Sequence, residues 1–370
     1  MSKHNVSYDE CVAPPLYISK LYGSTNELIC TEHNAIFRSP DGISWQKQKI
    51  TGNDFFPLQG ISVGDTIYTT NNGGDIYVLH NGVIKKYTHK WAKRIRFMGR
   101  INESILAVIE LRAGELVRDS GLISQRGDTN ITKYVIASSE SGRSWEKICG
   151  WDNHRSILNN WDDGESIIMD NDQALISNSS NRWFSHDLHD VSQIFDAACR
   201  ETQLLVLTDS SIISLRRKGD SFFTTGIVSI SSLSLRKMLR IGDLVYIVGR
   251  RPDTEESSTI NAYPISTIDS TYVLPLSRNL YIRTIIKYHD KYYALMLPNG
   301  YIYCSADGKY WERIIVMPDY ICEDMIVYKG RMITVGRLPR SQYDYIMLYS
   351  DNAYEWNRAI VDDGKNVYVQ

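Results

Sequence analysis

The chain has 370 residues, of which 43% are hydrophobic and 23% are charged, so it is long enough to bury a large core. Its 41 basic and 43 acidic residues give a formal net charge of -2 at pH 7. This balance argues against binding nucleic acid through a broad basic surface, and we expect no nucleic-acid partner.

The N-terminal segment, residues 1–15, is polar and is predicted to be a tail. It contains no apolar run of the kind found in secretory signals, and no later stretch is long and apolar enough to span a membrane. We therefore expect a soluble protein that is made in the cytoplasm and has no membrane span.

Along the chain, eight segments share one pattern: a Ser, an acidic or amide residue near a Gly or small residue, and then an aromatic residue. The pattern is clear in four segments and weaker in the others, and one weak copy has Lys in place of the aromatic residue. The residues at the aromatic position are Trp45, Lys85, Trp145, Trp183, Phe222, Tyr272, Trp311 and Trp356.

The spacing of these positions predicts the fold. Most successive intervals are 38 to 45 residues, and two are longer, at 60 and 50. Each unit also divides into four short runs rich in Tyr, Ile and Val, as in residues 281–289, 291–299, 301–307 and 310–316. The period and the strands predict a single all-β propeller with about eight, or alternatively seven, four-stranded antiparallel blades over residues 16–361. Residues 362–370 are predicted to be a C-terminal tail or a closing strand.

The recurring residues have a structural explanation. We name the strands of each unit A to D from the axis outwards, which places the pattern at the turn between C and D. That turn needs an Asp or Asn that accepts backbone hydrogen bonds and a Gly that tolerates positive φ. The aromatic residue then begins strand D and buries a large apolar area between blades.

These residues resemble the Asp-box, or BNR, repeat of sialidase-like propellers, whose short form is Ser-x-Asp-Gly-x-Thr-Trp. Residues 39–45 and 305–311 match the short form, and residues 138–145 match a longer form with Glu in place of Asp. The structural positions carried over from the resemblance are Ser39, Asp41, Gly42, Trp45, Ser138, Glu140, Gly142, Trp145, Trp183, Phe222, Tyr272, Ser305, Asp307, Gly308, Trp311, Ser350 and Trp356.

The resemblance implies a fold and leaves the activity open. Sialidases of this family carry an Arg-Ile-Pro-type motif ahead of the first box, and nothing before Ser39 fits it. The similar residues 337–339 lie in the last repeat. A carboxylate-binding cluster in an axial pocket remains an alternative, and its candidate residues on or near inner strands are Arg94, Arg96, Arg155, Arg240 and Arg283.

The two long intervals and the last repeat contain insertions, at about residues 111–132, 250–258 and 337–343, that fall between strands B and C. All three should project from the same face of a propeller, and long loops on a rigid scaffold often bind partners. Arginine is suited to bidentate recognition of carboxylates. The candidate partner-binding residues in these loops are Arg112, Arg118, Arg126, Arg250, Arg251, Arg337 and Arg340.

Other chemistry is weakly represented. The six cysteines have no Cys-x-x-Cys spacing, which predicts buried side chains, not zinc ligands or disulfides. His186 and His189 lie in an acidic segment that is better interpreted as a solvated loop than as a metal site. No nucleophile elbow or phosphate-binding motif is present. We expect no metal, no cofactor and no catalytic residue.

The sequence thus favours a non-catalytic propeller that acts as a protein-interaction or architectural module. The Lys-, Ile-, Asn- and Tyr-rich composition is similar to that of virion-associated propellers of phages. By that analogy the protein is a tail, fibre or capsid-associated component, whose partners are virion proteins or a host receptor bound through the B–C loops. The alternative is a glycan-binding or sialidase-like glycoside hydrolase propeller that uses the axial pocket, so the question of enzymatic activity stays open.

Overall fold

The fold is taken from a computed structural model of the whole chain. It describes residues 20–32, 35–49, 59–71, 73–101, 103–112, 134–151, 157–160, 166–170, 173–177, 183–187, 194–200, 203–208, 211–218, 221–229, 234–241, 244–250, 258–264, 272–276, 281–297, 300–308, 310–314, 316, 320–338, 345–362 and 367–369.

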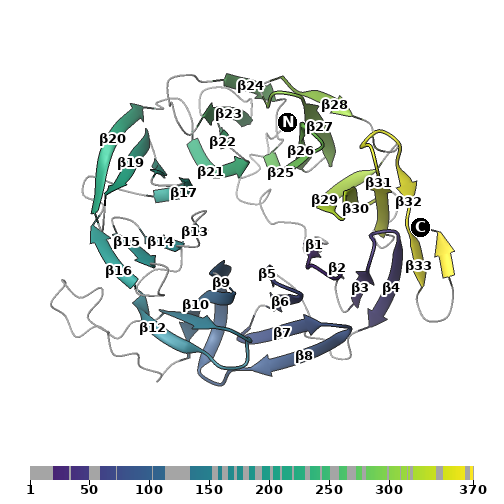
Figure 1. Cartoon of the computed structure of the whole chain (residues 1–370), viewed down its shortest axis with the longest axis horizontal. Helices are drawn as coiled ribbons and strands as arrows, with labels where there is room; N and C mark the ends of the chain where they lie inside the picture. Colours follow the sequence, from purple (N-terminus) through teal and green to yellow (C-terminus); the bar gives the residue numbers. More distant parts are fainter. Residues whose placement is uncertain are drawn as a thin grey trace, which may run out of the picture.

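The described residues form eight sheets arranged around a central axis, and we number these blades 1 to 8 in chain order (Figure 1). In each blade the strand that comes first in the chain lies nearest the axis, and the chain then moves outwards by antiparallel neighbours. These first strands are the A strands, and the next three are B, C and D. The alternation of Val, Ile, Leu and Tyr with short turns produces this repeated four-strand meander.

The first four blades are formed as follows. Blade 1 contains β1 (Lys20–Gly23), β2 (Leu28–Glu32), β3 (Ala35–Ser39) and β4 (Ser44–Lys49), with β33 (Ile360–Asp362) and β34 (Val367–Val369) added at its outer edge. Blade 2 contains β5 (Gln59–Val63), β6 (Thr66–Thr70), β7 (Asp75–His80) and β8 (Val83–Thr88). Blade 3 contains β9 (Ala92–Ile101), β10 (Ser104–Leu111), β11 (Tyr134–Ser139) and β12 (Glu146–Trp151). Blade 4 contains β13 (Ile157–Asn160), β14 (Ser166–Asp170), β15 (Gln173–Ser177) and β16 (Trp183–Asp187).

The other four blades continue the ring. Blade 5 contains β17 (Ile194–Arg200), β18 (Gln203–Thr208), β19 (Ser211–Lys218) and β20 (Ser221–Ser229). Blade 6 contains β21 (Ser234–Ile241), β22 (Leu244–Arg250), β23 (Ser258–Pro264) and β24 (Tyr272–Leu276). Blade 7 contains β25 (Tyr281–Tyr288), β26 (Lys291–Leu297), β27 (Tyr301–Ser305) and β28 (Glu312–Ile314). Blade 8 contains β29 (Ile321–Tyr328), β30 (Arg331–Arg337), β31 (Tyr345–Ser350) and β32 (Asn357–Arg358).

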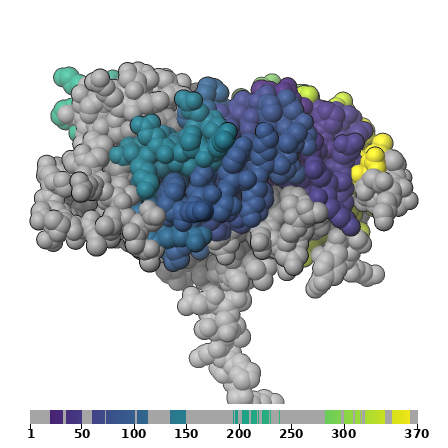
Figure 2. All heavy atoms as spheres, turned by 90° about the horizontal axis from the view of Figure 1, so that it is seen from below, coloured from purple at the N-terminus to yellow at the C-terminus, as the bar shows by residue number. Residues whose placement is uncertain are grey.

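The predicted fold was seven or eight blades, each of four antiparallel strands. That prediction is wrong, because blade 1 is a six-stranded sheet in which one pair of strands is parallel. β33 runs parallel to β4, with Ile360 opposite Ser44 and Asp362 opposite Gln46, and β34 pairs with β33 antiparallel. The physical reason is that an outermost strand leaves a row of unpaired N–H and C=O groups, which the returning chain satisfies. Figure 2 shows the C-terminal residues of this sheet beside the N-terminal ones at the rim.

The core lies between neighbouring blades. Leu28 and Trp45 of blade 1 pack with Ile333 and Met347 of blade 8, and all four side chains are at most 2% exposed. Similar clusters join blades 1 and 2, blades 2 and 3, and blades 7 and 8. Each blade therefore depends on apolar contact with its neighbours for its stability.

Two partly buried aspartates join A strands of adjacent blades. Asp196 of β17 accepts a hydrogen bond from the next residue's N–H at 2.9 Å and one from Met238 N of β21 at 2.7 Å. Asp324 of β29 accepts from the next residue's N–H at 3.1 Å and from Leu21 N of β1 at 3.0 Å. Each aspartate follows a register shift in its strand. The Asp324 contact closes the ring on its inner side.

A series of three glycine substitutions should separate backbone strain from steric conflict. Gly42 has a φ of 79°, and an added Cβ would lie 2.5 Å from Ile333 Cδ1 of blade 8. Gly330 has a φ of 76° but open space around an added Cβ, and Gly226 has open space with no positive φ. We expect Gly330→Ala to lower the free energy of unfolding by about 1 kcal/mol through strain alone. Gly42→Ala should cost about 2–4 kcal/mol, because overpacking adds to strain.

Gly226→Ala is the neutral control and should leave stability unchanged or raise it by about 0.5 kcal/mol. Urea unfolding midpoints of the three variants provide the measurement. Equal losses for Gly42→Ala and Gly330→Ala would show that the contact between blades 1 and 8 is not tight at this turn.

Candidate functional site

The C–D turn of blade 1 has the hydrogen bonds that its sequence suggests. Ser39 Oγ accepts from Gly42 N at 2.7 Å, and Asp41 Oδ1 accepts from Ile43 N at 2.8 Å and Ser44 N at 3.0 Å. Burial would raise the pKa of Asp41, but the Ser44 and Ile43 N–H groups outweigh burial and hold this pKa below its usual value. The Trp45 indole Nε1 then donates to the Gly42 carbonyl at 3.1 Å. These groups are fully used inside the turn.

Blades 7 and 8 repeat the arrangement. In blade 7, Ser305 Oγ accepts from Gly308 N at 2.8 Å, and Trp311 Nε1 donates to the Gly308 carbonyl at 3.2 Å. In blade 8, Ser350 Oγ accepts from Ala353 N at 2.8 Å. Ala353 takes a φ of 65°, so an alanine occupies the left-handed position that glycine fills elsewhere.

Blade 3 forms the same turn in a different register from the one predicted. Ser139 Oγ accepts from Gly142 N at 2.8 Å, and Ser141 Oγ accepts from Arg143 N at 3.3 Å. Ser139 and Ser141 therefore make the bonds that the sequence had assigned to Ser138 and Glu140. The pattern Ser-x-x-Gly with the aromatic residue three positions later is the short form, and two consecutive serines had concealed it.

The weaker copies also lie at the start of D strands. Trp183 begins β16, Tyr272 begins β24, and Phe222 is the second residue of β20. Lys85 lies in β8. The side chains of Trp183 and Tyr272 fall outside the described part of the chain.

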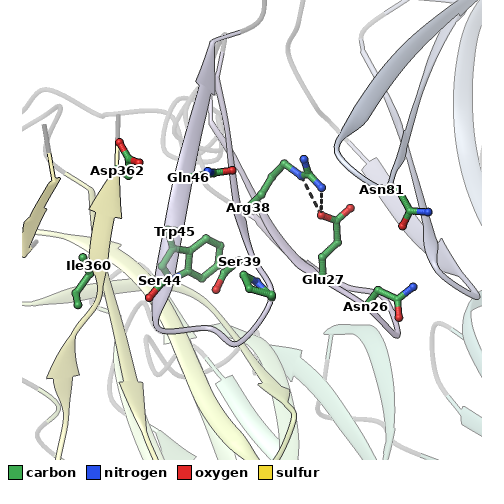
Figure 3. Close-up of a pocket in the computed structure, with 11 residues that line it drawn as sticks. Asn26, Glu27, Arg38, Ser39, Ser44, Trp45, Gln46, Asn81, Ile360 and Asp362 are labelled. Carbon is green, nitrogen blue, oxygen red and sulfur yellow. Dashed lines mark hydrogen bonds and ion pairs between the residues drawn. The ribbon is translucent and has the colours of Figure 1, made fainter. Parts of the chain in front are cut away.

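A surface cavity of about 600 Å³ lies beside the blade 1 turn (Figure 3). Arg38 and Glu27 point toward each other at its inner end, and Arg38 Nε donates to Glu27 Oε2 at 2.9 Å. Gln46 and Asp362 lie opposite each other on β4 and β33, and Asn81 of blade 2 also lines the cavity. Although most lining residues are polar, most of the surface that they expose to the cavity is apolar, and Arg38, Glu27 and Ser39 already bond one another or the turn. The cavity is therefore not a distinct site for a polar ligand.

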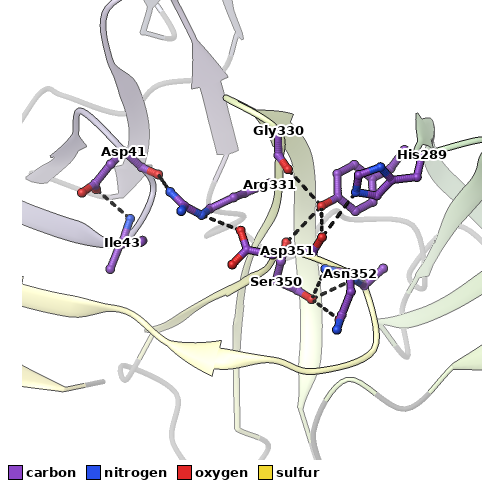
Figure 4. A network of polar contacts seen from close by, with 10 residues as sticks. Asp41, Ile43, His289, Gly330, Arg331, Ser350, Asp351 and Asn352 are labelled. Carbon is purple, nitrogen blue, oxygen red and sulfur yellow. Dashed lines mark hydrogen bonds and ion pairs between the residues drawn. The ribbon is translucent and has the colours of Figure 1, made fainter.

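The same turns carry the polar contacts between blades 7, 8 and 1 (Figure 4). The Tyr288 hydroxyl of blade 7 lies 2.7 Å from the Asp351 carbonyl and 3.0 Å from the Gly330 carbonyl of blade 8. Arg331 of blade 8 pairs with the Asp351 carboxylate at 2.7 Å and reaches the Asp41 carbonyl of blade 1 at 3.5 Å. The C–D turns are thus joints between blades, and their polar groups are occupied in that role.

Tyr288 and Tyr328 form a matched pair for testing these joints. Both end an A strand and both are buried, but the Tyr328 hydroxyl has no hydrogen-bond partner among the described residues. Tyr288→Phe should lower the free energy of unfolding by about 1–2 kcal/mol, because it leaves carbonyl acceptors unpaired. Tyr328→Phe should be neutral or stabilising, because it removes a buried group that makes no bond. Thermal denaturation of the two variants checks this order, and a larger loss for Tyr328→Phe would contradict it.

The B strands that precede the three predicted insertions all end at one face of the ring, while nearly all residues of the insertions lie outside the described part of the chain. β10, β22 and β30 are the B strands of blades 3, 6 and 8, and residues 112, 250 and 337 lie at or just beyond their C-terminal ends. Because every blade runs outwards in the same sense, the ends of all B strands point to the same face of the propeller (Figure 1). We call this face, from which the B–C loops emerge, the loop face.

The structure places some of the predicted arginines and leaves others undescribed. Arg112 is exposed, and its Nε donates to the Ala92 carbonyl at 3.1 Å. Arg337 lies with its Nε 3.1 Å from Oε1 of the buried Glu323. Arg250 ends β22, but its side chain is outside the described residues, as are Arg118, Arg126, Arg251 and Arg340.

The loop face also carries a charge cluster that sequence reasoning missed. Glu110, 1% exposed on β10, accepts from Lys93 Nζ at 2.8 Å and from Arg96 Nε at 2.8 Å. Arg94 is the register partner of Glu110 on β9. Burial would raise the pKa of Glu110, but the hydrogen bonds from Lys93 and Arg96 outweigh it and lower that pKa. The spacing of these residues in the sequence does not reveal the pairing of β9 with β10 or the register shifts that bring Lys93 and Arg96 to Glu110.

Replacing Glu110 should destabilise the protein in a pH-dependent way. Because its pKa is lowered in the folded state, the carboxylate contributes stability above its ordinary pKa and loses it as the pH falls through the folded value. Glu110→Gln should therefore cost about 1–3 kcal/mol at pH 7, and the difference from the parent should shrink in acid. Urea unfolding between pH 3 and pH 7 measures it. Glu103→Gln, which removes the exposed partner of Arg100, should change stability by less than about 0.5 kcal/mol.

A pH-independent loss in Glu110→Gln would mean that the carboxylate acts through packing and not through charge.

Elsewhere in the described part of the chain, no group of three or more His, Cys, Asp or Glu side chains is placed to hold a metal ion. The same residues include no helix long and apolar enough to cross a membrane.

The comparisons with known proteins concern the fold. No protein-family model matches the chain, and no curated protein matches it by sequence. Apo AztD from Citrobacter koseri is 10% identical with a TM-score of 0.55, and the match covers 94% of this chain and 95% of AztD. Streptogramin B lyase is 11% identical with a TM-score of 0.51, over 77% of this chain and 92% of the lyase.

PorZ, described as an essential bacterial surface component of the type-IX secretion system of Porphyromonas gingivalis, is 10% identical with a TM-score of 0.49. That match covers 93% of this chain and 45% of PorZ, so this chain spans less than half the length of PorZ. The comparisons give no support for an Asp-box or sialidase-like family or for a phage origin. Identities this low establish the architecture only: the chain has the fold of a β-propeller.

Proposed function

We propose that this protein is a non-catalytic β-propeller that binds a protein partner through its loop face. The observation that carries the proposal is that β10, β22 and β30, the strands that precede the three predicted insertions, all end at the same face. Insertions concentrated on one face of a rigid ring are suited to recognition, since the scaffold fixes their ends and leaves their sequences free to vary.

The chemistry of the described groups supports this choice over the opposite face. The C–D turns on that other face use their Ser, Asp and Trp side chains to hold the turn and join the blades. On the loop face, by contrast, Arg112 is exposed and Lys93 has a side chain that is 61% exposed. Exposed arginine at the rim of a concave scaffold favours protein interfaces and carboxylate partners.

A finer assignment follows the sequence resemblance. We propose that the turns are Asp-box turns in the BNR sense, and that the protein is a virion component, in a phage tail, a fibre or a capsid, that docks other virion proteins or recognises a host receptor. The hydrogen bonds of the turns in blades 1, 7 and 8 support the first part, and composition supports the second. Localisation in the cytoplasm before assembly is part of the same proposal.

Partner capture from the native source tests the proposal, with the purified chain as bait. The loop-face variant carries Arg112→Glu, Arg118→Glu and Arg250→Glu. Its control carries three reversals away from the loop face, Lys85→Glu, Arg143→Glu and Lys218→Glu. We expect the loop-face variant to weaken capture about tenfold, or 1.4 kcal/mol, with no loss in the control. Equal capture by both variants would overturn the loop face as the docking site.

The identity of the captured proteins tests the finer assignment. Virion or assembly proteins among them would support it, and a set without such proteins would count against it. The alternative function, a glycan-binding or sialidase-like propeller, is favoured by one observation: Arg94, Arg96, Arg240 and Arg283 all lie on A strands, while Arg155 is outside the described residues. A glycan array run beside the capture separates the two, because the interaction module should leave the array silent.

A further inference from the structure

The A strands carry an unusual share of the positive charge. Together β1, β5, β9, β13, β17, β21, β25 and β29 contain eleven Lys and Arg residues and three Asp and Glu residues, although the whole chain has a net charge of -2. These strands surround the axis (Figure 1). The eleven cationic residues are Lys20, Lys93, Arg94, Arg96, Arg100, Arg200, Arg236, Lys237, Arg240, Arg283 and Lys287, of which the side chains of Arg200, Arg236, Lys237 and Arg240 fall outside the described part of the chain.

The three carboxylates on these strands offset only part of this charge, and Asp324 interacts electrostatically with Arg283 and Lys20. Asp196 and Asp324 accept backbone N–H groups, and Glu323 pairs with Arg337 from β30. Two carboxylates from outside the A strands take part, since Glu110 pairs with Lys93 and Arg96, and Glu103 pairs with Arg100. Even with these two included, the cations exceed the carboxylates by six. Nine of the eleven cations lie on β9, β21 and β25. A local excess of one sign of charge on these strands strengthens the field beside them.

The charge is also uneven along the axis. Seven of the eleven cations lie in the first half of their strands. The A strands begin where the D–A connections arrive, which is the same end of the ring as the B–C loops. The end of the A strands that carries more cations therefore lies on the loop face, where Arg112 adds a further exposed cation.

We propose that the inner part of the loop face, where the A strands begin, binds an acidic polypeptide segment of the partner. This inference rests on the proposed function and names the chemistry that the partner presents. Seven of the eleven cations are arginines, whose planar guanidinium groups suit bidentate pairing with Asp and Glu carboxylates. Because Arg94 and Arg283 come from different blades, carboxylates along one extended segment can reach cations on separate strands at once.

Poly-L-glutamate titrated into the full chain at low ionic strength is the direct test. The axial variant Arg94→Gln/Arg283→Gln removes two charges from A strands. Because Arg283 also interacts electrostatically with Asp324, the melting temperature of the variant is measured beside its binding. The matched control Lys49→Gln/Lys85→Gln removes two charges from D strands. We expect the axial variant to weaken poly-L-glutamate binding about threefold to tenfold and to reduce its salt dependence, with less than twofold change in the control.

Each outcome decides a separate point. Equal weakening in the axial variant and the control would overturn the inference, and so would parent-level binding in an axial variant that melts at the parent temperature. Binding of heparin or oligothymidylate with the affinity of poly-L-glutamate would replace the acidic peptide with a general polyanion. If the axial variant still captures the native partner while the loop-face variant does not, the inference fails and the proposed function stands. Capture unaffected by either variant removes both.

Discussion

Ring closure is the constraint on which the rest of this molecule depends. Each blade buries its apolar faces against two neighbours, so the last blade must pack on the first or leave a hydrophobic surface exposed. The chain closes on the inside through Asp324 and Leu21, in the middle through Trp45 and Ile333, and at the rim through β33 against β4. The three contacts join segments about as far apart as the sequence allows. Together, these three contacts hold blade 8 against blade 1 and so determine the position of the A strands around the axis.

The parts of this architecture that depend on local chemistry were predictable from the sequence. The turn of residues 39–45 is stabilised by hydrogen bonds between groups two or three residues apart, so its pattern survives as a motif. The spacing of such motifs then gave the four-strand unit. The errors also have local causes. Because Ser138 and Ser139 are adjacent, the sequence alone did not show that Ser139 is the serine that bonds the turn. No short-range signal distinguishes Ala353, which takes a glycine-like φ because the surrounding turn fixes its conformation.

What could not be predicted depends on contacts between distant residues. β33 pairs with β4 because an open strand edge needs partners, and a short run such as residues 360–362 carries no mark of which edge it will join. The candidate site divides in the same way. The B–C insertions were visible as long intervals, whereas the Glu110 cluster required the register shifts that bring Lys93 and Arg96 to one carboxylate. Buried ion pairs of this kind are determined by pairing geometry and not by sequence order.

The charge distribution shows how the fold can create a property that composition hides. A chain with a net charge of -2 gives no reason to expect an electropositive site, and by itself it argues against anionic ligands. Winding that chain so that each unit begins at the axis brings eight separated segments together, and these segments carry the positive excess. The compensating acidic residues lie elsewhere in the chain. Since field strength depends on where charges lie and not only on their sum, the inner part of the loop face can attract an acidic segment although the protein as a whole is slightly acidic.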